Sequence, residues 1–420
     1  MCSARLAPCL AVLLAFSPIS AHAQDGPVTA KIARSEAPAA DPISAQIGAE
    51  GIAPVLADLQ SRDALAPKDR FALGGLEFLA SLEATMRWQM EAGAARLLMP
   101  FIGNVPGGRD APRETFTADA VTRQSEALIA GMNRAKTALD GLADGAEFGL
   151  AINLNDLWFD LNGNGARDDG GEDAVTLLRG AFMPRSPEAA PGASRIVRFD
   201  NADAAWLSAY THLISGVGEL TLAFDPEPAI ARVMDTYAKL VEARDRATGT
   251  GQVTSMDGMM MFSFIDPAAA VLDMLHQQPD PTRTRAARDH WLAMIAQNRQ
   301  FWELAEAETD NQAEWIPSDA QDQALGVEFP DGLGETWRGV LSDGEALLTS
   351  EKSFPFWRVP VGVDLGAWLE NPAPLPLTGV VQGWALDPYF TDTPMLTPEN
   401  WTRFSRLVGR RTGMMMFTLN

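Results

Sequence analysis

The chain has 420 residues, of which 46% are hydrophobic, and its formal net charge is −22. This hydrophobic content suffices for a large buried core and excludes a chain that is disordered throughout. Because so acidic a protein repels phosphate groups, its charge argues against nucleic acid and anionic membrane surfaces as partners, and favours cations.

The first 23 residues have the organisation of a secretory signal peptide. Arg5 supplies the positive charge, an apolar stretch runs from Leu10 to Phe16, and Ala21-His22-Ala23 is a small-x-small cleavage motif. The apolar stretch is too short to span a membrane, and no later stretch reaches the roughly 20 apolar residues that a span needs. We therefore expect cleavage after Ala23 and a periplasmic or secreted protein without a membrane span.

Both cysteines, Cys2 and Cys9, lie in this signal segment. The mature chain should therefore contain no disulfide, no cysteine nucleophile and no thiolate metal site. Cys9 precedes the apolar stretch, whereas a lipid-modified cysteine would follow it, so we expect no lipid anchor.

Residues 24–47 are rich in Ala, Pro, Ser and Asp and should form a flexible leader. From residue 48 to residue 420 helical periodicity dominates, with stripes that predict helices over 71–91, 117–142, 201–224, 281–308, 331–349 and 397–408. Alternation from Phe148 to Leu154 predicts a short strand. We predict a mainly α fold, namely one large helical domain or two lobes that meet near residue 250, with a few short strands.

The most specific motif follows the predicted strand. Within residues 160–172, Asp160, Asn162, Asn164 and Asp168 occupy the first, third, fifth and ninth positions, and Gly165 occupies the sixth. This spacing lets alternate side chains point inward, while the glycine permits a sharp turn, and Ca²⁺ takes about six to eight oxygen ligands. The sequence therefore predicts a calcium loop.

The segment resembles the calcium loops of EF-hand and dockerin-type modules. The resemblance implies that Asp160, Asn162 and Asn164 bind through their side chains, that Ala166 binds through its carbonyl, and that Asp168 binds directly or through water. With the next available acid added, the expected ligands are Asp160, Asn162, Asn164, Ala166, Asp168 and Glu172.

Two positions depart from the EF-hand pattern. The twelfth is Gly171, so the candidate acid Glu172 comes one residue late, and the eighth, which is apolar in paired EF-hands, is Arg167. We therefore expect a single structural site with a weak affinity of roughly 10⁻⁴ to 10⁻³ M, rather than half of an EF-hand pair.

The histidines offer a second set of candidate ligands or bases. Those that follow the signal segment are His212, His276 and His290. Their spacing lacks the His-x-His and His-Glu-x-x-His patterns of zinc sites. Ser208, His212, Ser215 and Glu219 form one polar stripe of a predicted helix. If another helix covers this stripe, His212 and Glu219 can act as a base and its partner or as ligands; otherwise the stripe is a solvated face.

Two similar methionine-rich segments occur at 258–264 and 413–419. In strands, Met259 and Met261 would share a face, as would Met414 and Met416. Such pairs suit Cu(I), but the simpler interpretation is two apolar strands that pack in the core.

The leading interpretation is a non-enzymatic exported helical protein with a structural calcium ion, serving binding or envelope organisation. The alternative is a periplasmic hydrolase that acts on glycans, because the 11 tryptophans can line a sugar-binding cleft. The positions of five tryptophans distinguish the two interpretations, namely Trp206, Trp291, Trp302, Trp357 and Trp384. If they are exposed in one cleft beside two carboxylates, they favour the hydrolase, and if they are all buried, they favour a scaffold. The order of segments also resembles that of exported bacterial proteins, a resemblance that implies no activity. The sequence identifies no protein or glycan partner.

Overall fold

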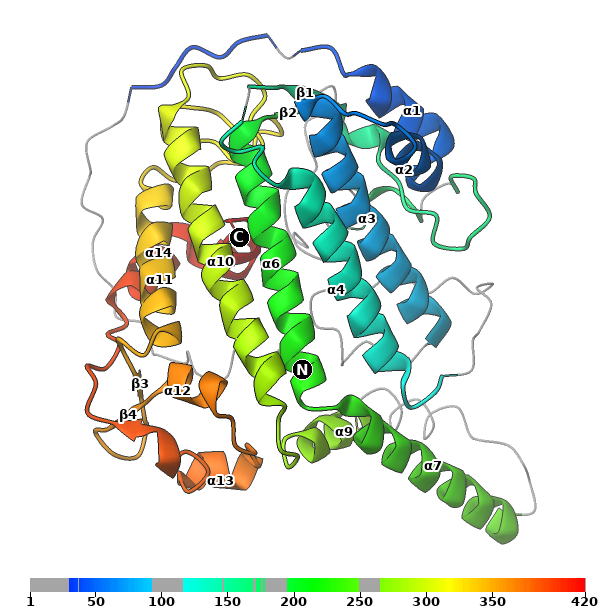
Figure 1. Ribbon diagram of the computed structural model, residues 1–420, viewed down its shortest axis with the longest axis vertical. Coiled ribbons are helices and arrows are strands. Elements are labelled where there is room, and N and C mark those ends of the chain that lie inside the picture. The colour runs from blue at the N-terminus through cyan, green and yellow to red at the C-terminus, as the bar shows by residue number, and fades with distance from the viewer. Residues whose placement is uncertain are drawn as a thin grey trace.

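The computed structural model of the protein describes residues 30–36, 38–92, 116–145, 147–168, 171–174, 177, 195–248 and 265–419. The fold is mainly α-helical with a few short strands, as the sequence predicted (Figure 1). The helices are α1 (Pro42–Glu50), α2 (Ile52–Gln60), α3 (Pro67–Ala92), α4 (Ala120–Leu139), α6 (Asn201–Ala223), α7 (Pro226–Thr248), α9 (Asp266–Met274), α10 (Pro281–Ala307), α11 (Leu333–Leu348), α12 (Leu365–Glu370), α13 (Leu377–Gln382), α14 (Glu399–Val408) and α15 (Thr412–Leu419).

The long helices α3, α4, α6 and α10 stand side by side, and α11 packs on the far side of α10 (Figure 1). Their apolar stripes are the reason for this arrangement. In α4, for example, Val121, Leu128, Met132, Ala135 and Leu139 recur at helical spacing and are all buried. By contrast, α7 points away from the bundle.

Helix α6 is the central member of the bundle, since it packs against both α4 and α10. Asp200 caps its start by accepting a hydrogen bond from the N–H of Ala202 at 2.9 Å, and Asp203 accepts one from the N–H of Asp200 at 3.0 Å. Two glycines then allow close approach on opposite sides. A Cβ at Gly216 would lie 2.5 Å from Nε1 of Trp291 in α10, and one at Gly218 would lie 2.8 Å from Cγ1 of Ile129 in α4.

The strands form two small antiparallel sheets. One consists of β1 (Leu150–Asn153) and β2 (Ile196–Phe199), with Leu150 opposite Phe199. The other has the order β3 (Phe354–Pro355), β4 (Gly362–Val363) and β5 (Phe390–Thr391). The first sheet confirms the strand predicted before the acidic loop, and the 3-10 helix η3 (Leu154–Asp156) follows β1 directly.

The two sides of residue 250 share one core. Buried residues from α6, such as Ala202 and Ala209, belong to the same hydrophobic cluster as Ile295 of α10 and Leu419 at the C-terminus. A second cluster joins α1, α2 and α3 to the β1–β2 sheet. Residues on both sides of position 250 therefore contribute to the same hydrophobic cluster. Among these residues, no helix is long and apolar enough to cross a membrane.

The flexible leader expected over residues 24–47 is shorter than the sequence indicated. Helix α1 begins at Pro42, and Ser44 donates a 2.6 Å hydrogen bond to Asp156. Before the helix, the N–H groups of Ile32 and Ser35 bond to the carbonyls of Ala320 and Asn311. Composition alone concealed this order because the contacts are made with residues far away in the chain.

The C-terminal methionine segment is a helix, not the strand that was expected. It forms α15, in which Met415 is fully buried. The indole N–H of Trp206 in α6 donates to the carbonyl of Thr418 at 2.9 Å. The side-chain amide of Asn298 in α10 donates to the carbonyl of Leu419. A short apolar run fits either period, so its surroundings decide. The segment 258–264 lies outside the described residues.

Gly216→Ala is expected to lower the free energy of unfolding by about 1–3 kcal/mol, because the new methyl group would overlap the Trp291 ring and force α6 and α10 apart. Chemical denaturation measures the loss. Gly344→Ala in α11 is the matched control, since its Cβ would meet only Ile295 at 3.8 Å. That control should gain roughly 0.5–1 kcal/mol through helix propensity. Equal effects of the two substitutions would contradict the role of Gly216.

Candidate functional site

The segment predicted to bind calcium is a closed loop. Its two ends are joined by hydrogen bonds from the N–H of Phe159 to the carbonyl of Glu172 at 2.9 Å and from the N–H of Ala174 to that of Leu157 at 3.1 Å. A β-bridge between Trp158 and Asp173 lies at the same place. These contacts fix the start of the loop at the end of η3 and return the chain to it.

Inside the loop, side-chain oxygens accept hydrogen bonds from the backbone. The Asp160 carboxylate accepts from the N–H groups of Asn164 and Gly165, both at 3.0 Å. The Asn162 side chain accepts from the N–H of Asn164 at 2.9 Å, and that of Asn164 accepts from the N–H of Ala166 at 2.7 Å. Gly165 has φ 72°, a left-handed conformation that favours glycine. The turn predicted at the sixth position is therefore present.

The side chain of Glu172 closes the loop. It is only 4% exposed, and its carboxylate accepts from the N–H of Leu161 at 2.9 Å and from the N–H of Asp168 at 2.8 Å. Asp168 in turn accepts from the amide of Asn162 at 2.5 Å. The structure thus brings together the side chains of Asp160, Asn162, Asn164, Asp168 and Glu172, and Ala166 takes part through its N–H.

The arginine at the eighth position points away from the other loop side chains. Arg167 donates to the carbonyl of Asn155 in η3 at 2.8 Å and to Asp173 at 2.9 Å. It therefore holds the loop to the preceding 3-10 helix. Its bonds explain why a polar residue stands where a paired EF-hand has an apolar one.

Helix α3 contributes two residues that sequence reasoning missed. Glu83 accepts from the N–H of Asp160 at 2.9 Å, and Arg87 bonds to the carbonyl of Asp160 and to Glu83, at 3.2 Å each. Burial raises the pKa of Glu83 to about 7, and the charges of Asp160 and Glu172 add to this, while the Asp160 N–H and Arg87 oppose it. The i, i+4 pair of Glu83 and Arg87 was visible in the sequence, but nothing there connected it with residue 160.

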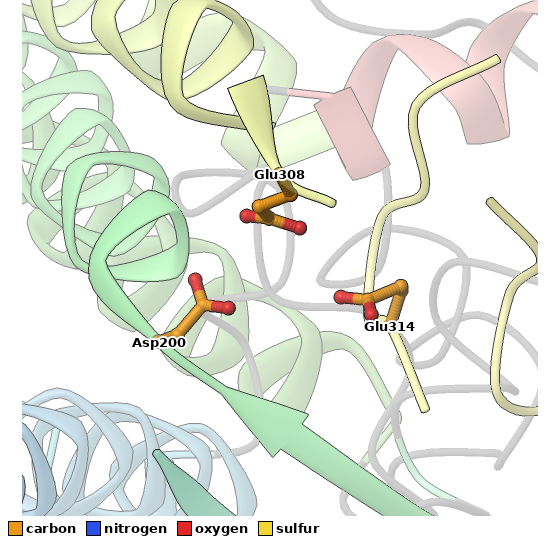
Figure 2. Close-up of side chains that lie close together, drawn as sticks. All are labelled: Asp200, Glu308 and Glu314. Atoms are coloured by element: carbon orange, nitrogen blue, oxygen red, sulfur yellow. The ribbon is translucent and has the colours of Figure 1, made fainter. Parts of the chain in front are cut away.

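A second acidic group lies at the other end of the β1–β2 sheet, where α6 begins and α10 ends. Figure 2 shows the carboxylates of Asp200, Glu308 and Glu314 pointing toward one another. One oxygen of each lies within 4.8 Å of the others. We call these three residues the acidic triad. The sequence did not predict it, because its members come from the start of α6, the end of α10 and the loop beyond.

The acidic triad is strongly perturbed by burial. Burial, with a smaller contribution from the nearby charges of Asp200 and Asp310, raises the pKa of Glu308 to about 8 and that of Glu314 to about 7. Burial likewise raises the pKa of Asp200, although the guanidinium of Arg198, at 3.1 Å, opposes it. Such carboxylates can share protons or hold a hard cation, since both relieve their mutual repulsion.

The predicted polar stripe of α6 is covered, by α4 and α10. His212 contacts His290 of α10 through their Nδ1 atoms at 2.9 Å, and Glu219 accepts from Arg283 of α10 at 2.8 Å. His276 is exposed at the end of α9 and bonds to the carbonyl of Leu272. The described contacts therefore join two of the three histidines. His212 pairs with His290 and Glu219 pairs with Arg283, so these contacts do not pair His212 with Glu219.

The tryptophans fall into two groups. Trp302 is 2% exposed, and Trp206 and Trp291 are partly buried against the core. Trp357 and Trp384 are 73% and 59% exposed, in the region of the β3–β4–β5 sheet. A surface hollow of about 560 Å³ between α3 and α4 is lined by Arg62, Arg70 and Arg134, with no tryptophan among its lining residues. The five tryptophans are thus divided between core and surface.

Glu308→Gln is expected to stabilise the protein at about pH 8, by about 1 kcal/mol or more, because it removes a negative charge from the acidic triad. A carboxyl group whose folded pKa is raised binds more protons when folded. The advantage of the variant should therefore grow as pH rises from about 5 to 8. Chemical denaturation in the presence of a chelator measures this difference.

Glu303→Gln, which changes an exposed residue of the same helix, is the control and should show little pH-dependent difference. An advantage of Glu308→Gln that stays constant between these pH values would contradict the raised pKa of Glu308.

Comparison with known proteins identifies no relative of this chain. No protein-family model, no curated protein and no solved structure matches it. The similarity of residues 160–172 to EF-hand and dockerin-type loops therefore depends on those residues alone, and the function has to be argued from the geometry.

Proposed function

We propose that this is an exported, non-enzymatic helical protein that binds one structural calcium ion in the loop 160–172 and serves in binding or envelope organisation. The observation that carries the proposal is the pair of hydrogen bonds from the N–H groups of Asn164 and Gly165 to the Asp160 carboxylate. These bonds bend the chain so that oxygen-bearing side chains at 162, 164 and 168 meet. Little rearrangement would then be needed to surround an ion.

The charge of the loop supports a cation. Asp160, Asp168 and Glu172 bring three carboxylates together, and Glu83 of α3 adds a fourth on the same side. Arg87 offsets part of this charge, and Arg167 is paired with Asp173 outside the ligand set. A divalent ion would offset this excess of negative charge, whose repulsion is strengthened by the burial of Glu172 and Glu83.

The donor atoms support calcium rather than a transition metal. Carboxylates, side-chain amides and a backbone carbonyl are hard oxygen ligands, and the loop contains no imidazole or thiolate. Asn162, Asn164 and Asp168 are exposed, so water can complete the coordination. Such an irregular, partly hydrated shell suits Ca²⁺ better than Mg²⁺, which demands near-octahedral geometry.

The ion would act on stability. The loop starts at η3, is closed by Glu172, and is fastened to α3 by Glu83 and Arg87. Tying its donors to one ion would therefore hold residues 157–174 against the bundle. With three charged ligands we expect a dissociation constant of roughly 10⁻⁴ to 10⁻³ M, which suits the calcium levels outside cells.

A glycan-directed hydrolase is the second candidate. The exposed rings of Trp357 and Trp384 favour it, and Arg358 lies over the Trp357 ring at 5.5 Å. Aromatic faces of this kind can stack on sugar rings. However, in the acidic triad Asp200 and Glu314 are only 8% and 4% exposed, so a polymeric substrate would not reach them. This is why we rank the hydrolase below the calcium-binding scaffold.

Calcium at ten to one hundred times its dissociation constant is expected to stabilise the wild type by roughly 1–3 kcal/mol, because the ion binds the folded loop and not the unfolded chain. Thermal melting without calcium and with calcium at about 10–100 mM measures the effect, because these concentrations reach at least ten times the weaker expected dissociation constant. Asp160→Ala should abolish it, since this substitution removes the carboxylate that organises the turn.

Asp392→Ala removes an exposed acid beyond β5 and should keep the full effect of calcium. Magnesium at the same concentration controls for ionic strength. An unchanged melting temperature of the wild type at these calcium concentrations would rule out the structural ion. An equal increase in Asp160→Ala would show that the ion binds elsewhere.

A further inference from the structure

A pair of histidines links the two central helices of the bundle. His212 of α6 and His290 of α10 are half-buried, and their Nδ1 atoms lie 2.9 Å apart. Their ring centroids are 5.1 Å apart, with the ring planes tilted by 53°. Because α6 and α10 pack along each other over their lengths, a change at this contact acts on the centre of the fold.

The chemistry of imidazole limits how many protons the pair can hold. A hydrogen bond between two Nδ1 atoms requires one protonated and one unprotonated nitrogen, so the two neutral rings must be opposite tautomers. One additional proton can bind to the outer Nε2 of the donor ring without breaking the bond. A second additional proton makes both Nδ1 atoms donors, and the contact must then open.

The charged groups around the pair act on its protonation in both directions. Lys136 of α4 places a positive charge near both rings, while Glu219 of α6 and Asp289 of α10 act in the other direction on His290. Glu219 is already paired with Arg283 of α10 at 2.8 Å, and Arg283 lies 3.9 Å from Glu126 of α4. The facing charges therefore include two cations, Lys136 and Arg283, and Arg283 lies close to the carboxylates of Glu219 and Glu126.

We propose that the His212–His290 contact is an acid-sensitive latch between α6 and α10, which is closed while the pair is neutral or singly protonated and opens when both rings are charged. Opening would separate the middle of the two helices next to Lys136, where a third positive charge adds to the repulsion. The ligand that the latch senses is the proton.

The direction of the pH effect follows from the pKa values. Burial lowers the pKa of His212 to about 4, and the charges of His290 and Lys136 contribute; burial and Lys136 also lower that of His290. An unfolded histidine titrates near pH 6.5. The contact therefore contributes its full stability above about pH 6.5 and loses it as pH falls toward 4. The acidic triad responds in the opposite direction, because its raised pKa values make acid stabilising there.

Nuclear magnetic resonance of the full chain with isotopically labelled histidine tests the latch directly. At neutral pH, His212 and His290 should show opposite tautomers. On acidification they should titrate in two separate steps, the second at a proton concentration at least about tenfold higher than that at which an unfolded histidine titrates. His276 serves as the internal control, since it lies outside the pair.

Hydrogen exchange supplies the second measurement. Amides of α6 and α10 near the pair should lose protection by about tenfold or more between pH 7 and 4.5, after correction for the intrinsic exchange rate. His290→Gln, whose amide can still bond to Nδ1 of His212 but cannot be charged, should remove most of this loss, and His276→Gln should leave it unchanged. The latch is refuted if His212 and His290 share one tautomer, if both titrate in a single step near pH 6.5, or if His290→Gln loses protection as the wild type does.

Discussion

The close approach of α6 to its two neighbours is the constraint on which the rest of the structure depends. Gly216 leaves room for the indole of Trp291 on the face of α6 that packs against α10. Gly218 leaves room for Ile129 on the face of α6 that packs against α4. This spacing sets which side chains face each other along the helix. The acidic triad starts at the cap of α6, and the histidine pair lies in its middle.

Charge is distributed through this bundle in an unusual way for a core. Carboxylates are buried at the start of α6, at the loop 160–172 and along α6, and the charged partners of the three groups differ. Glu219 is neutralised by Arg283, Glu83 is offset by Arg87, and Arg198 pairs with Asp200 of the acidic triad. Because a buried charge is costly without a partner, the triad favours protons while the loop has the donors to favour a cation.

The elements that could be predicted are those with local causes. The stripe of α4 is read from spacings of a few residues, and it is present. The Met414–Met416 run was assigned to a strand because a short apolar run has no decisive period, and its helix is selected by contacts with Trp206 and Asn298. The leader was assigned to disorder because its bonds to Asn311 and Ala320 leave no trace in composition.

The sequence by itself determined the turn of the loop 160–172 and which side chains supply its oxygen atoms. The hydrogen bonds that form the turn, from the N–H groups of Asn164 and Gly165 to Asp160, join residues at most five positions apart. It also determined the positions of the long helices. Only the tertiary structure decided that Glu83 and Arg87 fasten the loop, that His212 meets His290, and that Asp200 meets Glu308 and Glu314. These pairings join residues that are far apart in the chain, and their distances are set by how α3, α6, α10 and the adjoining loops pack rather than by any spacing along the chain.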